Sequence, residues 1–472
     1  MSNALDLADL QGIIARSYAT LTAARYVLLA IDDPGPARSW LSALAELLTT
    51  ARTRPETRAV NVAFTPSGLG KLGLGADVLA AFSHEFLDGL TAPNRGRLLG
   101  DVDANAPEHW HWGGPANLPI DILLLFFARD EAELAALETE CLAAGANGLS
   151  VVARLETVDL GGTEHFGFAD GISQPTIEGL SRKDAPANTV KAGEFILGYP
   201  NEYGLYTDRP TLPRSADPRG LLPPDPSGSA EVDLGRNGSY LVFRQLRQDV
   251  RAFWQFVDNA TRRTDGTPDA AARVRLAAKM VGRWPSGAPL ALAPDHDDPR
   301  RAKSNDFGYF GTDAAGDRCP LGAHVRRSNP RDSLDPDPGS EKSIAVGKRH
   351  RLLRRGREYG KPLPPEDRLN PLPPNQEDDE RGLHFICLNA NLARQFEFIQ
   401  HTWVNNPTFQ GLYADDDPLV GPRGTSGGMF TIQATPVRDK FTDLPRFVTV
   451  VGGAYFFLPG VRAVRYLASL GS

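Results

Sequence analysis

Residues 119–158 read PIDILLLFFARDEAELAALETECLAAGANGLSVVARLETV. The apolar run at 119–128 is typical of a buried strand, and the acids that begin the next segment are typical of the first turn of a helix. A third segment, rich in Val and Leu, follows at 149–158. The stretch therefore predicts a strand, a helix and a strand in that order.

The residues that precede this stretch show the same three elements. YVLLAI at 26–31 and AVNVAFT at 59–65 have the apolar and β-branched residues of strands, and SWLSALAELL at 39–48 has the pattern of a helix. The combined order is βαββαβ, which is the order of ferredoxin-like folds, with an antiparallel sheet covered by helices. The sequence therefore predicts an α+β architecture.

A similar order recurs in the second half of the chain, without a clear repeat of residues. Strand-like segments lie at 238–246, 351–356, 383–390 and 446–460, and helix-like segments lie at 247–260 and 392–404. The chain between the halves is rich in Pro, Gly and Asp, which excludes long helices and central strands. We expect a ferredoxin-like domain at 1–195, a linker or ordered loop at 196–232 and a second ferredoxin-like domain at 233–472.

Composition limits the classes of function. Lys and Arg number 51 against 58 Asp and Glu, a net charge of −7, which disfavours a nonspecific binder of nucleic acid or anionic membranes. Cys141, Cys319 and Cys387 lack zinc-type spacing and fit a reducing compartment. The N-terminus lacks the pattern of an export signal, and no apolar run reaches the ~18 residues of a membrane span. We expect a cytoplasmic protein without nucleic-acid or membrane partners, and the sequence leaves open whether it forms a homo-oligomer.

FGFADGISQP at 166–175 places one carboxylate, Asp170, between glycines. Glycine accepts close approaches and backbone angles that other residues do not, so the segment is typical of an irregular loop pressed against another part of the molecule. An isolated Asp-Gly pair is also a common turn signal, and that interpretation stays open.

Two later segments contain groups that suit such a carboxylate. His324 lies in RCPLGAHVRRSNPRD at 318–332, where a neutral imidazole could bind a metal, although most histidines serve in the core or at the surface. In RLLRRG, Arg354 and Arg355 follow two leucines in a strand-like stretch, so they should point to opposite faces. One of them then lies inward and requires an anion or a strongly polar partner, and Asp170 is a candidate for it.

These segments, together with RQFEFIQHTWVNNPTF at 394–409 and GGAYFFLPG at 452–460, resemble the successive signature blocks of dye-decolorizing peroxidases. The blocks follow the family's order over most of the chain, and long insertions make the chain similar to the larger bacterial and fungal-type members. The resemblance implies two ferredoxin-like domains with haem b bound in the second. It also implies that hydrogen peroxide is used to oxidise an organic electron donor, a bulky phenol or dye.

The same resemblance implies roles for five residues. Asp170 matches the distal acid of the family, Arg354 the distal arginine and His324 the proximal ligand of the haem iron. Leu383 and Phe385 match apolar residues that wall the distal side of the pocket.

Two further assignments rest on residue type. We expect Arg326 to bind the haem propionates, because a guanidinium matches a carboxylate in geometry, with a surface salt bridge as the alternative. We expect Glu397 to orient the imidazole of His324, with a solvated position on an amphipathic helix as the alternative.

These residues suit the chemistry of peroxide cleavage. A positioned carboxylate can take a proton from peroxide and return it to the departing oxygen, while a fixed guanidinium stabilises the charge that develops there. Two other functions stay open from the sequence. A haem carrier or sensor on the same scaffold would need the axial ligand without the acid and the cation, and a ferredoxin-like binding protein would need no haem.

Overall fold

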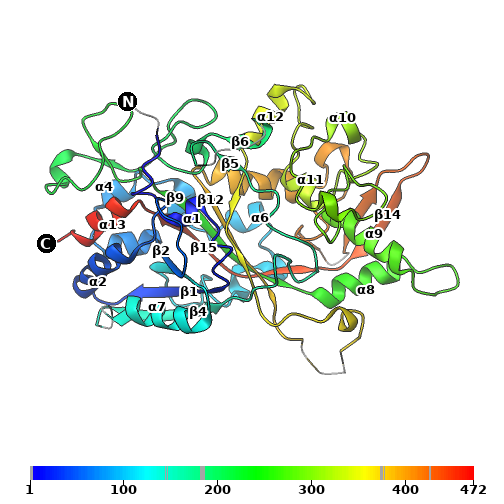
Figure 1. Ribbon diagram of the computed structural model, residues 1–472, viewed down its shortest axis with the longest axis horizontal. Coiled ribbons are helices and arrows are strands. Elements are labelled where there is room, and N and C mark those ends of the chain that lie inside the picture. Colours follow the sequence, from blue (N-terminus) through cyan, green and yellow to red (C-terminus); the bar gives the residue numbers. More distant parts are fainter. Residues whose placement is uncertain are drawn as a thin grey trace.

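The computed structural model describes residues 4–143, 145, 147–180, 186–372, 376, 378–424 and 427–471. Its centre is one sheet of nine strands in the order β10-β12-β9-β15-β2-β3-β1-β4, with β11 beside β12. Every strand pair in this sheet is antiparallel. Figure 1 shows the strands of the first half on the left, in blue and cyan, and helices of the second half on the right.

The first half of the sheet has the predicted element order. Its elements are β1 (Ala23–Ile31), α2 (Pro34–Leu47), β2 (Arg58–Phe64), β3 (Ile122–Ala128), α7 (Glu131–Ala143) and β4 (Leu149–Glu156). The strands lie in the order β2-β3-β1-β4. All residues of β3 are buried, because it lies between two strands and both faces of the sheet are covered, which explains its unbroken apolar run.

The second half repeats this spatial order. Its elements are β9 (Ser239–Gln248), α8 (Val250–Ala260), β10 (Leu353–Arg354), β12 (Gly382–Asn389), the π-helical turns η8 (Ala393–Glu397) and η9 (Ile399–Val404), and β15 (Val448–Leu458). The order β15-β9-β12-β10 corresponds to β4-β1-β3-β2 of the first half. The predicted α+β class with two ferredoxin-like units is therefore confirmed.

The two four-stranded units join through their edges. Strands β2 and β15 pair at Phe64 and Phe457, so the two predicted antiparallel sheets form one continuous sheet. Successive side chains of β1 point to opposite faces of this sheet, and both faces are covered. Val27 and Leu29 belong to one buried core, whereas Leu28 belongs to another core on the opposite face.

The other α-helices of the described residues are α1 (Gly12–Ala15), α3 (Pro66–Lys71), α4 (Ala76–Leu79), α5 (His84–Asp88), α6 (Arg95–Leu99), α9 (Ala270–Val281), α10 (Phe310–Asp313), α11 (His324–Ser328), α12 (Glu341–Lys348) and α13 (Val461–Ala468). The other strands are β5 (Thr176–Ile177), β6 (Thr189–Val190), β7 (Thr211–Leu212), β8 (Val232–Asp233), β11 (Arg357–Tyr359), β13 (Gly428–Ile432) and β14 (Asp439–Leu444). Within the described ranges, no helix is both long and apolar enough to cross a bilayer.

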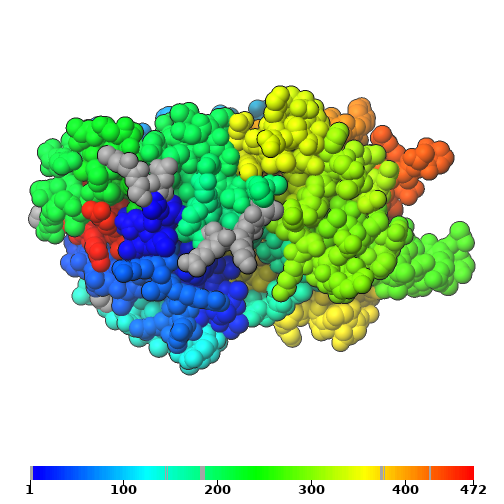
Figure 2. All heavy atoms as spheres, turned by 45° about the horizontal axis from the view of Figure 1, so that its top comes forward, coloured from blue at the N-terminus to red at the C-terminus, as the bar shows by residue number. Residues whose placement is uncertain are grey.

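The segment at 196–232 has only short elements, as its composition predicted. Leu197, Leu212 and Leu222 bury their side chains in the same core as Val27, so the segment is an ordered loop packed on the molecule. Figure 2 shows it in green, over the N-terminal part of the chain. The domain boundaries at 195 and 232 stay predictions.

A third core anchors the glycine-rich loop at 166–175. Phe166 and Phe168 are buried with α8, and the rings of Phe166 and Phe253 lie 4.5 Å apart. Helix α8 begins where the side chain of Asp249 accepts a hydrogen bond from the backbone of Ala252, which fixes the position of Phe253. The loop follows the first unit in sequence but packs against the second.

Candidate active site

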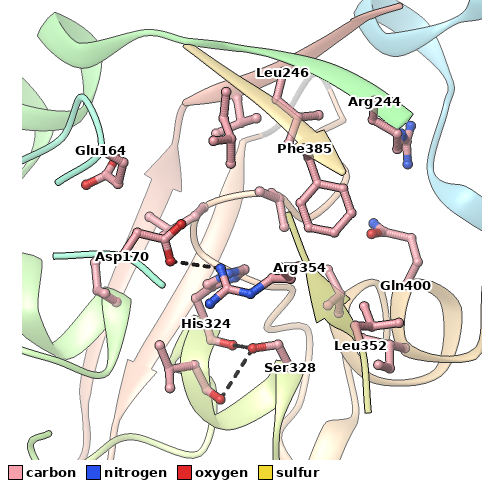
Figure 3. A pocket seen from close by; sticks show the side chains of 18 of the residues that line it. Glu164, Asp170, Arg244, Leu246, His324, Ser328, Leu352, Arg354, Phe385 and Gln400 are labelled. Atoms are coloured by element: carbon pink, nitrogen blue, oxygen red, sulfur yellow. Dashed lines mark hydrogen bonds and ion pairs between the residues drawn. The ribbon is translucent and has the colours of Figure 1, made fainter. Parts of the chain in front are cut away.

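A cavity of about 270 Å³ lies where the glycine-rich loop meets the second half of the sheet. Its wall includes Asp170 from the loop, His324 from α11, Arg354 from β10, and both Leu383 and Phe385 from β12. These five residues are the ones to which the resemblance gave the distal and proximal roles, and the fold brings them together. Figure 3 shows Asp170 and Arg354 turned toward each other, with Phe385 nearby.

Backbone hydrogen bonds hold the loop that presents Asp170. The backbone N–H of Asp170 donates to the carbonyl of Gly162, and that of Ala169 donates to the carbonyl of Pro285. Gly167 and Gly171 have φ angles of 96° and 77°, which glycine adopts without strain. The loop conformation therefore needs glycine at these two positions, and it directs the carboxylate into the cavity.

Asp170 and Arg354 form an ion pair inside the cavity. Nη1 of Arg354 donates to Oδ1 of Asp170 over 2.8 Å, and both side chains stay about one-third exposed to the cavity, at 33% and 30%. Burial raises the pKa of Asp170, but the charge and the hydrogen bond of Arg354 outweigh this and hold the pKa below its ordinary value of 3.8. The carboxyl is therefore ionised at neutral pH.

The alternation predicted for the two adjacent arginines is present. Arg354 points into the cavity, whereas the guanidinium of Arg355 is buried on the other side and donates to the carbonyls of Ile13 and Ile14. Arg354 thus has the partner for which the sequence made Asp170 a candidate, and the buried Arg355 is satisfied by backbone oxygens.

His324 is held by a carboxylate that sequence reasoning missed. Its Nδ1 lies 2.9 Å from Oδ2 of Asp417, whose side chain is completely buried. The other oxygen of Asp417 accepts the backbone N–H groups of Leu419 and Val420. Burial lowers the pKa of His324, but Asp417 outweighs it and raises the pKa above its ordinary value. The pairing leaves Nε2 of His324 without a hydrogen-bond partner among the described residues.

The assignment of Glu397 to His324 is wrong. Glu397 accepts a hydrogen bond from the phenol of Tyr455 over 2.8 Å and forms an ion pair with Arg95. The residue that orients His324 lies instead in the run of three acids at 415–417, where the sequence gives no signal that separates one acid from the next.

The assignment of Arg326 to the haem propionates is also wrong. Arg326 is completely buried outside the cavity wall, where it binds the carboxylate of Asp313 and lies 4.4 Å from the ring centre of Tyr309. Residues two apart on a helix point in nearly opposite directions, and on α11 His324 and Ser328 face the cavity instead. In the sequence, His324 and Ser328 are four residues apart and therefore lie on one face of a helix, whereas Arg326 does not. This spacing would have excluded Arg326 from the face that carries His324.

Three other arginines line the cavities of this region; Arg283 and Arg351 are buried and Arg331 is half-buried. Arg283 lines the main cavity, Arg331 lines a smaller cavity beside it, and Arg351 lines both. Within the described ranges none of the three has a carboxylate partner, since their hydrogen bonds go to backbone carbonyls and neutral side chains. Burial, with the neighbouring charges of Arg331 and Arg354, lowers the pKa of Arg351 to about 9. Three cations to which no described carboxylate is hydrogen-bonded favour an anionic ligand.

The residues present fit a haem. The cavity offers apolar walls and, among the described residues, an imidazole nitrogen without a partner. The buried Nε atoms of Arg283 and Arg331 likewise have no acceptor within the described ranges. An iron porphyrin presents the complementary groups, namely a metal, a flat apolar ring and two carboxylates. The ion pair of Asp170 and Arg354 adds a carboxylate, which is able to take and return a proton, and a guanidinium, which is able to stabilise negative charge.

Comparisons with known proteins agree with this site. The chain is 30% identical to a "Dye-decolorizing peroxidase" of Mycena epipterygia, over 99% of this chain and 88% of that protein. It is 30% identical to the "Multifunctional dye peroxidase DyP2" of an Amycolatopsis species, over 93% and 91% of the two chains. A solved dye-decolorizing peroxidase in complex with 2,6-dimethoxyphenol superposes with a TM-score of 0.79 at 26% identity, covering 98% of this chain and all of the other. No protein-family model matches the sequence.

Proposed function

Because the chain belongs to the dye-decolorizing peroxidase family, we propose that Asp170, Arg354 and His324 divide the peroxidase reaction among them. The protein is a haem peroxidase that uses hydrogen peroxide to oxidise dyes and phenols, and haem b is the cofactor of the family. The observation that supports the assignment is the 2.8 Å pair of Asp170 and Arg354, which faces the cavity into which His324 also points.

The haem would be held by residues from the second half of the chain. Nε2 of His324 would bind the iron, and Arg283, Arg331 and Arg351 would bind the two carboxylates. When bound, the haem supplies an iron that binds peroxide and takes up its oxidising equivalents. Leu383 and Phe385 keep that part of the cavity apolar, which limits competing water.

Asp170 would move the proton during cleavage of peroxide. Its carboxylate takes a proton from one peroxide oxygen and returns it to the other, which leaves as water. The low pKa set by Arg354 keeps the carboxylate ready to accept. Arg354 also faces the departing oxygen with a fixed positive charge, so the developing negative charge is stabilised without rearrangement.

Asp417 would hold the imidazole of His324, the iron ligand, through its Nδ1. Because it accepts a hydrogen bond from Nδ1 of His324, it fixes the tautomer in which Nε2 is the free ligand atom. Its negative charge makes the imidazole a stronger electron donor. Asp417 is therefore a positioning residue, and it does not touch peroxide.

The alternative of a haem carrier or sensor is tested by Asp170→Asn. A carrier would need the ligand and the arginines for the carboxylates, but it would gain nothing from a proton-moving acid paired with a cation. We expect the variant to keep haem and to lose roughly 10³-fold in peroxide-dependent dye oxidation, because it lacks the base. His324→Ala serves as the contrasting variant and should lose the Soret absorbance. Unchanged turnover in Asp170→Asn would contradict the assignment.

We also propose the cytoplasm as the compartment and expect no nucleic-acid or membrane partner. The three cysteines are free and buried, which suits a reducing environment. The net charge of −7 opposes binding to nucleic acid and anionic lipid. Fractionation of the native cells, followed by detection of the protein, would test the compartment.

A further inference from the structure

Glu397 is a buried acid that the proposed mechanism does not use. It is 6% exposed, and one of its oxygens accepts the hydrogen bond of Tyr455, which is itself 2% exposed. Arg95 of α6 forms an ion pair with the same carboxylate, and Asp88 pairs with Arg95 nearer the surface. Tyr455 thus has a carboxylate acceptor for its phenolic proton inside the protein.

The phenol of Tyr455 lies one ring away from the cavity. Phe396 lines the cavity wall, and its ring meets the ring of Tyr455 edge to face, with centres 6.2 Å apart and planes at 84°. Phe385, which also lines the cavity, lies 6.3 Å from Phe396. An electron that leaves Tyr455 for the cavity therefore crosses the thickness of a single side chain.

A tyrosine is readily oxidised only if its proton leaves together with the electron. Burial raises the pKa of Tyr455, with the charge of Glu397 adding to the effect, so the phenol keeps its proton at rest. Burial also raises the pKa of Glu397, which makes this carboxylate a better base, although Tyr455 and Arg95 oppose the shift. The pair is arranged so that the proton has a short path at the moment when the electron departs.

Two tyrosines among the described residues donate to a carboxylate. The second is Tyr359, whose phenol lies 3.0 Å from Glu380. Tyr359 stacks on His384, which does not line the cavity. Of these two tyrosines, only Tyr455 has both a carboxylate acceptor and a ring contact with a side chain that lines the cavity.

We propose that Tyr455 is a redox-active residue that holds one oxidising equivalent of the peroxidase as a neutral tyrosyl radical, with Glu397 as its proton acceptor. This inference rests on the proposed function, since hydrogen peroxide supplies the oxidant through the bound haem. Tyr455 loses one electron to the oxidised haem, and its O–H bond breaks as the proton passes to Glu397. When a phenolic or dye donor returns one electron to Tyr455, Glu397 returns the proton. Two such cycles account for the two electrons that one peroxide accepts.

Freeze-quench electron paramagnetic resonance on the haem-loaded protein tests the proposal. The wild type, treated with one equivalent of hydrogen peroxide and no donor, should show a tyrosyl signal that narrows when the protein contains ring-deuterated tyrosine. Tyr455→Phe should lose this signal, while Tyr359→Phe should retain it. Glu397→Gln keeps the shape of the side chain but not the base, so the signal should form at least ~10-fold more slowly. Tyr26→Phe removes a buried phenol that has no hydrogen-bond partner among the described residues. It is the matched control and should give the same signal as the wild type.

The outcomes separate this inference from the proposed function. Peroxide consumption is measured in the same samples, and unfolding is monitored by circular dichroism. A folded Tyr455→Phe that retains the tyrosyl signal would overturn the proposal, as would loss of the signal in Tyr359→Phe instead. A wild type that consumes peroxide without a tyrosyl signal rejects the radical and leaves the assignment of Asp170 intact. A wild type that does not consume peroxide rejects both.

Discussion

Two aspartates beside the cavity have the same side chain and opposite surroundings. Asp170 is one-third exposed to the cavity and forms an ion pair with Arg354. Asp417 is fully enclosed, and its two oxygens are occupied by His324 and by two backbone N–H groups. A carboxylate that exchanges protons must stay accessible to the substrate. A carboxylate that orients a ligand is most effective when both of its oxygens are already hydrogen-bonded.

After Asp170→Asn itself, the largest effect on turnover is expected at Arg354, the partner of the open acid. Arg354→Leu should lower the turnover number for peroxide-dependent oxidation by roughly 10²- to 10³-fold, because the departing oxygen loses its fixed donor. The neighbouring Arg355→Leu should instead cost about 1–3 kcal/mol of unfolding free energy, since it strands the carbonyls of Ile13 and Ile14. Steady-state kinetics and urea unfolding distinguish the two. If both variants lost the same turnover and the same unfolding free energy, the opposite orientation of Arg354 and Arg355 would be contradicted.

A smaller loss is expected from the enclosed acid. Asp417→Asn removes the charge behind His324 and should weaken haem affinity or activity by roughly 10- to 100-fold. The measurement is a haem titration of the apoprotein, followed by absorbance of the Soret band. An effect as large as that of Asp170→Asn on turnover, with haem affinity unchanged, would show that Asp417 does more than position the ligand.

The pH dependence sharpens the contrast at Asp170. Its folded pKa lies below 3.8, so the active carboxylate should persist as the pH falls to about 4 and disappear only below that value. Without Arg354, burial alone raises the pKa, so the acidic limit of the residual activity in Arg354→Leu should move up by about 1–3 pH units. A pH–rate profile of both proteins gives the comparison. Coincident acidic limits would show that Arg354 does not set the pKa of Asp170.

The smallest effect on haem binding is expected at Glu397. Because Glu397 pairs with Arg95 and Tyr455 and has no contact with His324, Glu397→Gln should bind haem like the wild type. The same titration used for Asp417→Asn provides the reference. A shift as large as that of Asp417→Asn would restore the original assignment of Glu397.

Much of the fold was predictable, because strands buried on both faces leave long apolar runs. The run at 122–128 became β3, and the order of elements in each half was correct. The union of both sheets through Phe64 and Phe457 was not predictable, since an edge pairing between distant strands leaves no local pattern in the sequence.

The site was predictable where local geometry decides and not where long-range packing decides. Strand alternation separated Arg354 from Arg355, and both point as predicted. The partner of His324 was missed because Asp417 approaches it from a loop 93 residues away, and Asp415 and Asp416 have the same chemistry. The arginines without carboxylate partners were equally hidden, because a missing partner becomes visible only once the neighbours of a residue are known.

The pairing of β2 with β15 also bears on when the cavity becomes complete. Asp170 comes from the loop after β4, whereas His324 and Arg354 come from the second half of the chain. A chain in which the second unit alone had folded would therefore present His324 and Arg354 without the facing carboxylate. The cavity is completed only when both units of the continuous sheet are in place.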